Sequence, residues 1–464
     1  MTVAADTVTD EMLQRFDVPG PRYTSFPTAD RFVEAFTAGD YEQALAQRRS
    51  GVAASALPLS IYVHIPFCES LCYYCACNKI ITKHHERAQP YLEYLKKEIA
   101  LHTAVIGKGQ HVSQLHLGGG SPTFLNDDEL RELMAMLRDA FTLTPGGECS
   151  IEIDPRTIDT KRLDTLQELG FNRLSFGVQD FDPAVQIAVH RVQPAKQVFA
   201  LVAAARERGF ESINIDLIYG LPKQTPESFD RTLEQVKLLR PDRIALYAYA
   251  HLPERFKPQR RIASVDLPPP GDKLAMLSRS LVALRGAGYV YIGMDHFALP
   301  DDALAVAKRQ GRLHRNFQGY STQPDCDLIG LGVSSIGRIG ATYSQNAKTM
   351  DEYCDLLNHG QFPVVRGLAL TRDDLVRRTV IMALMCQGQV LFESIELAYL
   401  LEFRQYFAKE LETLQTLIDQ GLATMDEAGI QVTPQGWFFV RAVAMVFDHN
   451  LQSDRTRARF SKII

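Results

Sequence analysis

The sequence lacks long apolar runs, a recognisable export signal and a strong excess of basic charge. No stretch reaches the eighteen or so apolar residues of a membrane span, so we expect no membrane association. Residues 1–12 contain acidic residues but no basic segment followed by an apolar core, which predicts a cytoplasmic protein. The formal net charge of −5 argues against a surface that binds nucleic acid.

Cysteine is also scarce, yet half of it is concentrated in one place. Of the 8 cysteines in 464 residues, Cys68, Cys72, Cys75 and Cys77 lie close together. The preceding run, Ile61–Ile65, alternates apolar residues with Tyr62 and His64 and stops at a proline. This pattern predicts a β-strand that delivers the thiols on the loop at its end.

Clustered thiols form disulfides or bind zinc or iron-sulfur groups. A reducing cytoplasm disfavours disulfides. A structural zinc site usually draws ligands from two knuckles, and no second Cys or His pair at knuckle spacing follows. The spacing C-x3-C-x2-C instead allows one loop to offer three thiolates to a cubane cluster and to leave one iron open. We interpret the remaining cysteines, including Cys386, as small buried apolar residues.

Downstream of the cysteines, β-rich runs alternate with longer helical patterns, which predicts a parallel sheet covered by helices and closed into a full or partial barrel. The predicted strands are Ile61–Phe67, Gln114–Leu117, Cys149–Asp154, Arg173–Val178, Ser212–Tyr219, Arg243–Tyr249 and Tyr289–Met294. The predicted helices are Ala88–Val105, Asp127–Phe141, Ala195–Arg208, Pro226–Leu239 and Asp272–Leu284. Barrels of this kind carry their chemistry where strands end.

Several polar or glycine residues fall at those predicted ends. Gly118–Gly120 removes side chains between the backbone and any ligand. Glu152 faces the opposite side of its strand from Ile151 and Ile153, which suits it to a barrel mouth, whereas Asp154 before Pro155 suggests turn chemistry. Further along, His296, His314 and Arg315 are candidates for binding carboxylates of an anionic substrate, although isolated residues of these types are usually structural.

The C-x3-C-x2-C spacing, with Tyr74 before its last cysteine, resembles the signature of the radical S-adenosylmethionine (SAM) superfamily. The segment Tyr62–Cys68 and the additional Cys77 narrow the resemblance to oxygen-independent coproporphyrinogen III oxidases, from about Pro19 to the C-terminus. This resemblance implies an α/β fold, a radical-SAM partial (β/α)6-type TIM barrel. It implies an N-terminal arm at 1–58, the barrel at 59–360 and a mainly helical C-terminal cap with a small hairpin at 361–464.

The resemblance also implies roles for individual residues. Cys68, Cys72 and Cys75 would hold a [4Fe-4S] cluster, and Tyr62 and His64 would be catalytic residues pointing towards the cluster and SAM. Two SAM molecules are implied, with Tyr62 itself among the cofactor contacts. The remaining cofactor-binding residues implied in this way are Tyr74, Ala76, Gly119, Gly120, Ser121, Glu152, Gln179, Arg191, Asp216, Ala250 and Ile336. Ala76 stands where glycine is familiar, so its contact would be through the backbone.

The implied reaction converts two propionate side chains of coproporphyrinogen III into vinyl groups through a 5′-deoxyadenosyl radical, giving protoporphyrinogen IX for haem synthesis. The implied partners are an electron donor such as flavodoxin or ferredoxin and an unidentified electron acceptor, with the protein as a monomer. Two alternatives stay open. One is a haem-binding chaperone of the same family, whose members tend to lack the counterparts of Cys77 and of Arg22–Tyr23. The other is a zinc protein or iron-sulfur carrier that ignores SAM.

The two ends of the chain differ from the barrel pattern. Residues 1–18 are polar and are expected to be mobile, while Pro19–Thr28 is rich in proline and predicts an extended segment, which the resemblance places across the active-site mouth. Near the C-terminus, three helices are predicted at Thr371–Cys386, Glu402–Ile418 and Pro434–Phe447, with a hairpin turning at Glu427–Gly429. We interpret this region as a cap over the barrel and not as a DNA-binding unit, because no basic recognition helix is present.

Overall fold

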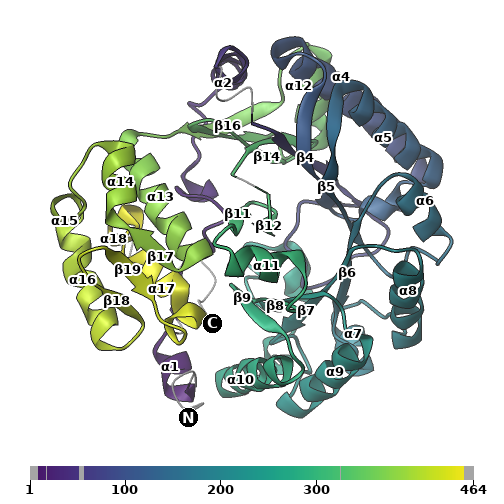
Figure 1. Ribbon diagram of the computed structural model, residues 1–464. Helices are drawn as coiled ribbons and strands as arrows, with labels where there is room; N and C mark the ends of the chain where they lie inside the picture. The colour runs from purple at the N-terminus through teal and green to yellow at the C-terminus, as the bar shows by residue number, and fades with distance from the viewer. Residues whose placement is uncertain (1–8, 17, 52–56, 324, 454–464) are drawn as a thin grey trace.

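A computed structural model describes residues 9–16, 18–51, 57–323 and 325–453 (Figure 1). Its centre is a long, open sheet in the order β16-β15-β14-β13-β1-β4-β5-β6-β7-β8-β10-β9. The strands from β13 to β8 in this order run parallel. They span β13 (Asp327–Leu331), β1 (Leu59–Ile65), β4 (Gln110–Gly119), β5 (Phe141–Ile153), β6 (Arg173–Gln179), β7 (Ser212–Tyr219) and β8 (Arg243–Ala248).

Helices cover the convex face of the parallel strands (Figure 1). These helices are α4 (Ala88–Ile106), α5 (Asp127–Ala140), α6 (Arg162–Glu168), α7 (Pro183–Ala188), α8 (Ala195–Glu207), α9 (Pro226–Leu239) and α10 (Pro270–Gly286). Local sequence explains their starts: Asn126 and Thr225 cap α5 and α9 in capping boxes with Glu129 and Ser228. The predicted partial barrel is therefore confirmed.

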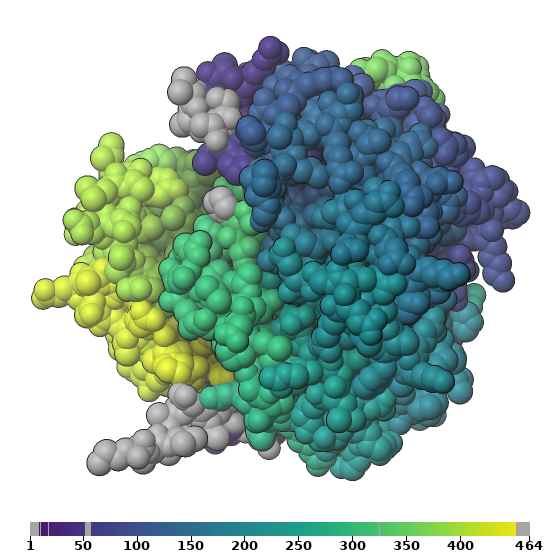
Figure 2. Space-filling model, turned by 45° about the vertical axis from the view of Figure 1, so that its right-hand side comes forward, coloured from purple at the N-terminus to yellow at the C-terminus, as the bar shows by residue number. Residues whose placement is uncertain are grey.

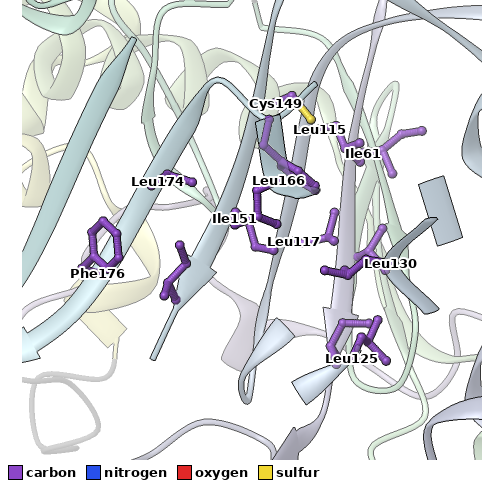
Figure 3. Packing of buried hydrophobic residues seen from close by; sticks show 14 of the residues in the cluster. Ile61, Leu115, Leu117, Leu125, Leu130, Cys149, Ile151, Leu166, Leu174 and Phe176 are labelled. Atoms are coloured by element: carbon purple, nitrogen blue, oxygen red, sulfur yellow. The ribbon is translucent and has the colours of Figure 1, made fainter. Parts of the chain in front are cut away.

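The apolar core lies between the sheet and these helices. Leu115 and Leu117 of β4, Ile151 of β5 and Phe176 of β6 alternate along their strands and point towards the helical layer, where Leu130 of α5 meets them (Figure 3). Full burial of each such side chain contributes about 1.5–3 kcal/mol. The period of two in a strand sends the intervening residues to the concave face. Those residues are largely polar, which reserves the barrel interior for chemistry.

The strands at both ends of the sheet are antiparallel. One end holds β14 (Ile336–Ile339), β15 (Thr342–Asn346) and β16 (Val364–Ala369), and the other holds β9 (Val290–Gly293) and β10 (His296–Ala298). The sequence analysis predicted Tyr289–Met294 as the next strand of the parallel series. β9 does run in the same direction as β8, but it pairs with β10, which lies antiparallel between the two strands. Met294 and Asp295 both adopt positive φ, as a tight hairpin turn requires, but a Met-Asp pair lacks the usual Asn-Gly signal.

The remaining elements surround this frame. The chain segment between β10 and β16 also contains two helices, α11 (Ala303–Arg309) and α12 (Met350–Asn358). It further contains a two-stranded ribbon of β11 (His314–Asn316) and β12 (Gly319–Ser321). The N-terminal region contributes α1 (Asp10–Arg15) and α2 (Ala38–Ser50), and the cysteine loop contains β2 (Phe67–Cys68) and β3 (Ile80–Ile81). Short 3-10 turns are η2 (Ala29–Arg31), η3 (His85–Arg87), η4 (Pro122–Phe124), η5 (Lys257–Arg261), η6 (Ser264–Asp266) and η7 (Gly436–Phe439).

The C-terminal region contains helices and a three-stranded sheet. Its elements are α13 (Arg372–Gln387), β17 (Gln389–Leu391), α14 (Phe392–Tyr399), α15 (Phe403–Tyr406), α16 (Ala408–Asp419), β18 (Ala423–Met425), β19 (Gly429–Val432), α17 (Val440–Met445) and α18 (His449–Ser453). The predicted hairpin is present as β18 and β19. The sequence analysis missed α14 and also β17, which pairs with β19 and is too short to show a period.

A second apolar cluster joins the chain ends to the sheet edge. Leu13 of α1, Phe26 of the arm, Ile292 of β9 and Leu384 of α13 all belong to it. Figure 2 shows the yellow C-terminal residues against the green segment near residue 300. The expectation that residues 1–18 are mobile was wrong for 9–16, because Leu13 anchors α1; residues 1–8 and 17 lie outside the described part. Within that part, no helix is both long and apolar enough to cross a bilayer.

A buried carboxylate on α4 ties together the strand ends behind the cysteine loop. Glu98 is 1% exposed and accepts hydrogen bonds from Gly332 N at 2.7 Å, Tyr353 Oη at 2.7 Å and Asn346 Nδ2 at 2.6 Å. Burial raises the pKa of Glu98 to about 7, although these hydrogen bonds oppose the rise. The protonated carboxyl is therefore favoured in the folded state.

Glu98→Gln is expected to flatten the pH dependence of stability. Because the folded-state pKa of Glu98 lies above its ordinary 4.5, its stabilising contribution is present at low pH and is lost as the pH rises through about 7. The loss amounts to about 3 kcal/mol, and glutamine has no proton to lose. Urea unfolding at about pH 5 and pH 8 measures the difference. Glu93→Gln, at an exposed position of α4, is the control, and equal slopes in the two variants would contradict the assignment.

Candidate active site

The cysteine loop opens directly from the end of β1. Cys68, Cys72, Cys75 and Cys77 line one cavity of about 250 Å³ at the carboxyl ends of the parallel strands. In the described residues, no three His, Cys, Asp or Glu side chains are arranged to hold a single metal ion. Soft thiolates spread around a cavity suit a multi-iron cluster, whose irons lie at separate corners. The donor set and the space therefore fit a [4Fe-4S] group.

Two arginines support the middle thiol of the loop. Arg156 and Arg191 each place a guanidinium nitrogen 3.5 Å from Cys72 Sγ, and both also form ion pairs with Asp154, at 2.6 and 3.2 Å. Burial opposes ionisation of Asp154, but the charges of the two arginines lower its pKa. This network places two positive charges beside the cavity and so favours an anionic thiolate ligand set.

The other thiols differ in their surroundings. Burial, reinforced by the neighbouring thiols, raises the pKa of Cys68 to about 12. The pKa of Cys75 is lowered to about 6, chiefly by a hydrogen bond from Cys77 and further by Lys79, whose Nζ donates to the Cys75 carbonyl at 3.2 Å. Cys77 thus lies close enough to support Cys75.

The glycine segment after β4 holds the cysteine loop against the sheet. Gly120 N donates to Ile65 O, and Ser121 N donates to Phe67 O, both at 2.8 Å. A Cβ atom on Gly120 would lie 2.7 Å from the carbonyl oxygen of Pro66, which is backbone and cannot move aside. Glycine at this position is thus required by the close approach of two chains, and the segment also lines the cavity.

A polar group of side chains faces the concave side next to the glycine segment. Glu152 accepts a hydrogen bond from Gly119 N at 3.1 Å and lies 3.5 Å from His116 Nε2. Burial opposes its ionisation, but His116 and the Gly119 amide outweigh burial and lower the pKa of Glu152. Tyr62 stacks on His116 at 5.8 Å and hydrogen-bonds His64 Nδ1 at 3.0 Å. Glu152 is therefore an ionised acceptor for hydroxyl groups of a ligand.

Asp216 of β7 is the second carboxylate on this face. It accepts hydrogen bonds from Asn214 Nδ2 at 2.9 Å and Ser175 Oγ at 3.3 Å. Burial, with a smaller contribution from the charge of Glu152, raises the pKa of Asp216 to about 7. The two carboxylates border both the cysteine cavity and a second cavity of about 150 Å³ inside the barrel. Two polar cavities thus adjoin each other inside the barrel.

Comparison with known proteins identifies this arrangement. The Radical SAM superfamily profile matches residues 62–236, and the HemN C-terminal domain profile matches residues 370–439. The oxygen-independent coproporphyrinogen III oxidases of Pseudomonas aeruginosa and Escherichia coli are 51% and 49% identical to this chain, each over 98% of both sequences. The solved structure of E. coli coproporphyrinogen III oxidase (HemN), described as a radical SAM enzyme, matches with a TM-score of 0.90 and 49% identity, covering 96% of this chain and all of that one.

The chain belongs to the oxygen-independent coproporphyrinogen III oxidase family. These full-length relatives support the oxidase interpretation and not the haem-chaperone alternative. As a radical SAM enzyme of this family, the protein has a [4Fe-4S] cluster and two SAM molecules as its cofactors, which removes the zinc-protein alternative.

The structure brings most of the predicted oxidase site residues together. Besides the cysteines, the predicted residues that line the cysteine cavity are Tyr74, Gly119, Gly120, Ser121, Glu152, Gln179, Arg191 and Asp216. Tyr62 and His64 lie directly behind this lining, since a Cβ on Gly119 would lie 2.7 Å from the His64 ring. Ala76, Ala250 and Ile336 are not part of the lining, and their roles in binding cofactor stay predictions.

Sequence reasoning missed part of this site. Asp154, assigned to turn chemistry, does accept a hydrogen bond from Thr157 N, but its carboxylate also joins two arginines beside Cys72. Tyr247 and Ser175 line both cavities and were not selected. The alternation of polar and apolar residues in β6 was the available signal for Ser175, because it places Ser175 on the same face as Arg173 and Gln179.

Proposed function

We propose that this protein catalyses the oxygen-independent oxidative decarboxylation of two propionate side chains of coproporphyrinogen III, giving the vinyl groups of protoporphyrinogen IX in porphyrin biosynthesis. The observation that carries the proposal is the cavity in which three thiols, supported by two arginines, adjoin a polar barrel interior containing Glu152 and Asp216. The names of the relatives support the choice of substrate.

We assign the cluster to Cys68, Cys72 and Cys75. When bound, the cluster and SAM together supply a 5′-deoxyadenosyl radical, which abstracts hydrogen from carbon positions that amino acid side chains cannot activate. Each propionate loses one hydrogen atom from its β-carbon, followed by carbon dioxide and one electron, which passes to an acceptor. The hydrogen atom would be taken up by the 5′-deoxyadenosyl group, so each propionate would consume one molecule of SAM.

The residues around the cavity would hold and orient these groups. Glu152, as an ionised acceptor, suits the ribose hydroxyls of one SAM, and Gln179, Arg191 and Asp216 suit a second. Tyr62 and His64 remain the proposed catalytic pair, since their mutual hydrogen bond and that from His64 Nε2 to Asn78 O, both at 3.0 Å, fix the two rings. The remaining proposed cofactor contacts are Tyr74, Ala76, Gly119, Gly120, Ser121, Ala250 and Ile336.

The same proposal includes a redox partner, an oligomeric state and a division of the chain into three parts. The reductant would be a small redox protein such as flavodoxin or ferredoxin, and the protein would act as a cytoplasmic monomer. The proposed divisions are the arm at 1–58, the barrel at 59–360 and the cap at 361–464. Arg22 and Tyr23 tie the arm to later parts of the chain, because Arg22 pairs with Asp295 and Tyr23 donates to Asp448 at 2.9 Å.

One experiment tests the function directly. The full-length protein, reconstituted and reduced without oxygen, is incubated with SAM and coproporphyrinogen III, and the products are weighed by mass spectrometry. We expect loss of two carboxyl groups from the tetrapyrrole and release of 5′-deoxyadenosine. SAM cleavage with an unchanged tetrapyrrole would contradict the proposed substrate. Tight binding of haem without any SAM cleavage would favour a carrier instead.

A further inference from the structure

Arg315 is a buried cation, and two of its donor atoms have no hydrogen-bond partner among the described residues. It lies on β11, which pairs with β12 in a two-stranded ribbon. Only 4% of the residue is exposed, and in the described part of the chain its Nε and Nη1 atoms have no hydrogen-bond partner. Buried guanidinium groups are normally paired, because removing an unpaired charge from water is costly. The described part of the protein therefore supplies no acceptor for these two nitrogen atoms.

Aromatic side chains surround the Arg315 guanidinium. Its guanidinium lies over the Tyr320 ring at 4.6 Å, and Arg22 of the arm lies over the Tyr247 ring at 5.2 Å. His296 stands edge-on to both tyrosines, with centroid distances of 6.0 and 5.6 Å, and its Nδ1 also lacks a hydrogen-bond partner in the described residues. Tyr247, His296 and Tyr320 line the barrel cavity of about 150 Å³. His296 therefore faces this cavity, and the guanidinium groups of Arg22 and Arg315 lie behind its lining, against Tyr247 and Tyr320.

Positive charge exceeds negative charge at this end. Asp295 pairs with Arg22, whereas buried Arg441 uses its guanidinium to hold the arm through the carbonyls of Gly20 and Pro21. Burial first, and then the charges of Arg315 and Arg22, lower the pKa of His296 to about 3. Burial and the charge of Arg22 similarly lower the pKa of Arg441 to about 10. A bound anion would lower the positive electrostatic potential at this end of the cavity.

The same cavity also meets the cofactor site. Glu152, Ser175, Asp216 and Tyr247 are shared between this cavity and the one lined by the cysteines. A ligand whose carboxylate rests on Arg315 would extend its carbon chain past Tyr247 towards Glu152 and Asp216. That direction leads to the place where the radical is formed.

We propose that Arg315, assisted by Arg22, binds a carboxylate of the bound ligand, and that this ligand is the tetrapyrrole substrate through one of its propionates. This inference rests on the proposed function and names a residue that determines its specificity. The methionyl carboxylate of SAM offers the same chemistry. We favour the propionate because SAM is expected against the cluster and the glycine segment, which line the other cavity.

The test compares Arg315→Gln with Arg312→Gln. Arg312 is exposed and lies three residues away, and its side chain donates to Gln310 Oε1, so it is a matched control. The probe is coproporphyrin III, the fluorescent tetracarboxylate, titrated into the full-length reconstituted protein. We expect Arg315→Gln to weaken its binding about tenfold or more, as loss of a charged hydrogen bond does, and Arg312→Gln to leave it unchanged. Arg315→Lys, which retains the charge but not the planar fork, should lie between them.

Two further measurements identify the carboxylate. Affinity for the uncharged tetramethyl ester of coproporphyrin III should be the same in wild type and Arg315→Gln. SAM affinity, measured by equilibrium dialysis, should also be unchanged; a variant that loses SAM affinity but retains coproporphyrin III affinity would overturn the assignment to the substrate. Failure of Arg315→Gln to fold would also overturn it, because the protein itself would then need this guanidinium.

The outcomes separate this inference from the function on which it rests. Wild-type protein that neither binds coproporphyrin III nor converts coproporphyrinogen III would overturn the proposed function. Wild-type protein that does both, with Arg315→Gln binding the porphyrin as tightly as Arg312→Gln does, would overturn only the role of Arg315.

Discussion

Cys72→Ser is expected to abolish both SAM cleavage and substrate conversion. Cys72 is buried at the cavity that the cysteine loop surrounds, and two guanidinium groups donate to its sulfur. A serine hydroxyl is a hard, protonated group at neutral pH and is a poor substitute for a thiolate ligand of iron. Without the cluster the enzyme has no source of radicals. The rate enhancement over the uncatalysed reaction, which is at least about 10⁶-fold for a typical enzyme, is therefore lost.

The measurement is made on anaerobically reconstituted protein. Iron and sulfide content, visible absorption and release of 5′-deoxyadenosine should all fall together in the Cys72→Ser variant. Cys386→Ser is the control, because Cys386 lies within α13, is buried among apolar residues and has a pKa raised to about 12 by that burial. Equal losses in the two variants would refute the division of the cysteines into ligands and core residues.

Asp154→Ala is expected to produce the second largest effect, this time on stability. The Asp154 carboxylate is the shared partner of Arg156 and Arg191, and all three side chains are mostly buried. Removing it leaves two neighbouring buried cations that repel each other. Loss of one member of a buried ion pair typically costs about 3–5 kcal/mol. The midpoint of urea unfolding should fall accordingly, and iron content should fall with it because both arginines also contact Cys72.

A matched control is present on the protein surface. Asp164 pairs with Arg208 at 2.6 Å, but its side chain is 62% exposed, so solvent screens the pair. Exposed pairs contribute little to stability, and Asp164→Ala should shift the unfolding midpoint little. If the two alanine variants shifted the midpoint equally, the Asp154 network would be no more than another solvated ion pair.

Much of the barrel could be predicted from local pattern. The strand at Ser212–Tyr219 and the helix at Pro226–Leu239 have the predicted bounds, and the capping box at Thr225 explains where that helix begins. Errors occurred where pairing was decided by distant partners. β10 follows β9 through a turn at Met294 and Asp295 and inserts antiparallel beside the distant β8, and β13 joins β1 as a parallel neighbour from far along the chain. Neither pairing leaves a mark in the local sequence.

The site shows the same division between local and distant information. The cysteine spacing, the glycine segment and the face of Glu152 were readable because each depends on residues adjacent in the chain. Asp154 was assigned only a turn because its second arginine, Arg191, lies 37 positions away. Arg315 was one candidate cation among several, and only the fold shows that it is buried without partners for two of its donor atoms.

The sequence by itself determined the grouping of the cysteines in one loop, the βα alternation and the family resemblance, since these follow from spacing and period along one chain. Tertiary structure alone decided which charges share a buried space and which remain uncompensated there. The physical reason is that desolvation and Coulomb energy depend on distance and burial in space, and neither quantity is a function of separation along the chain.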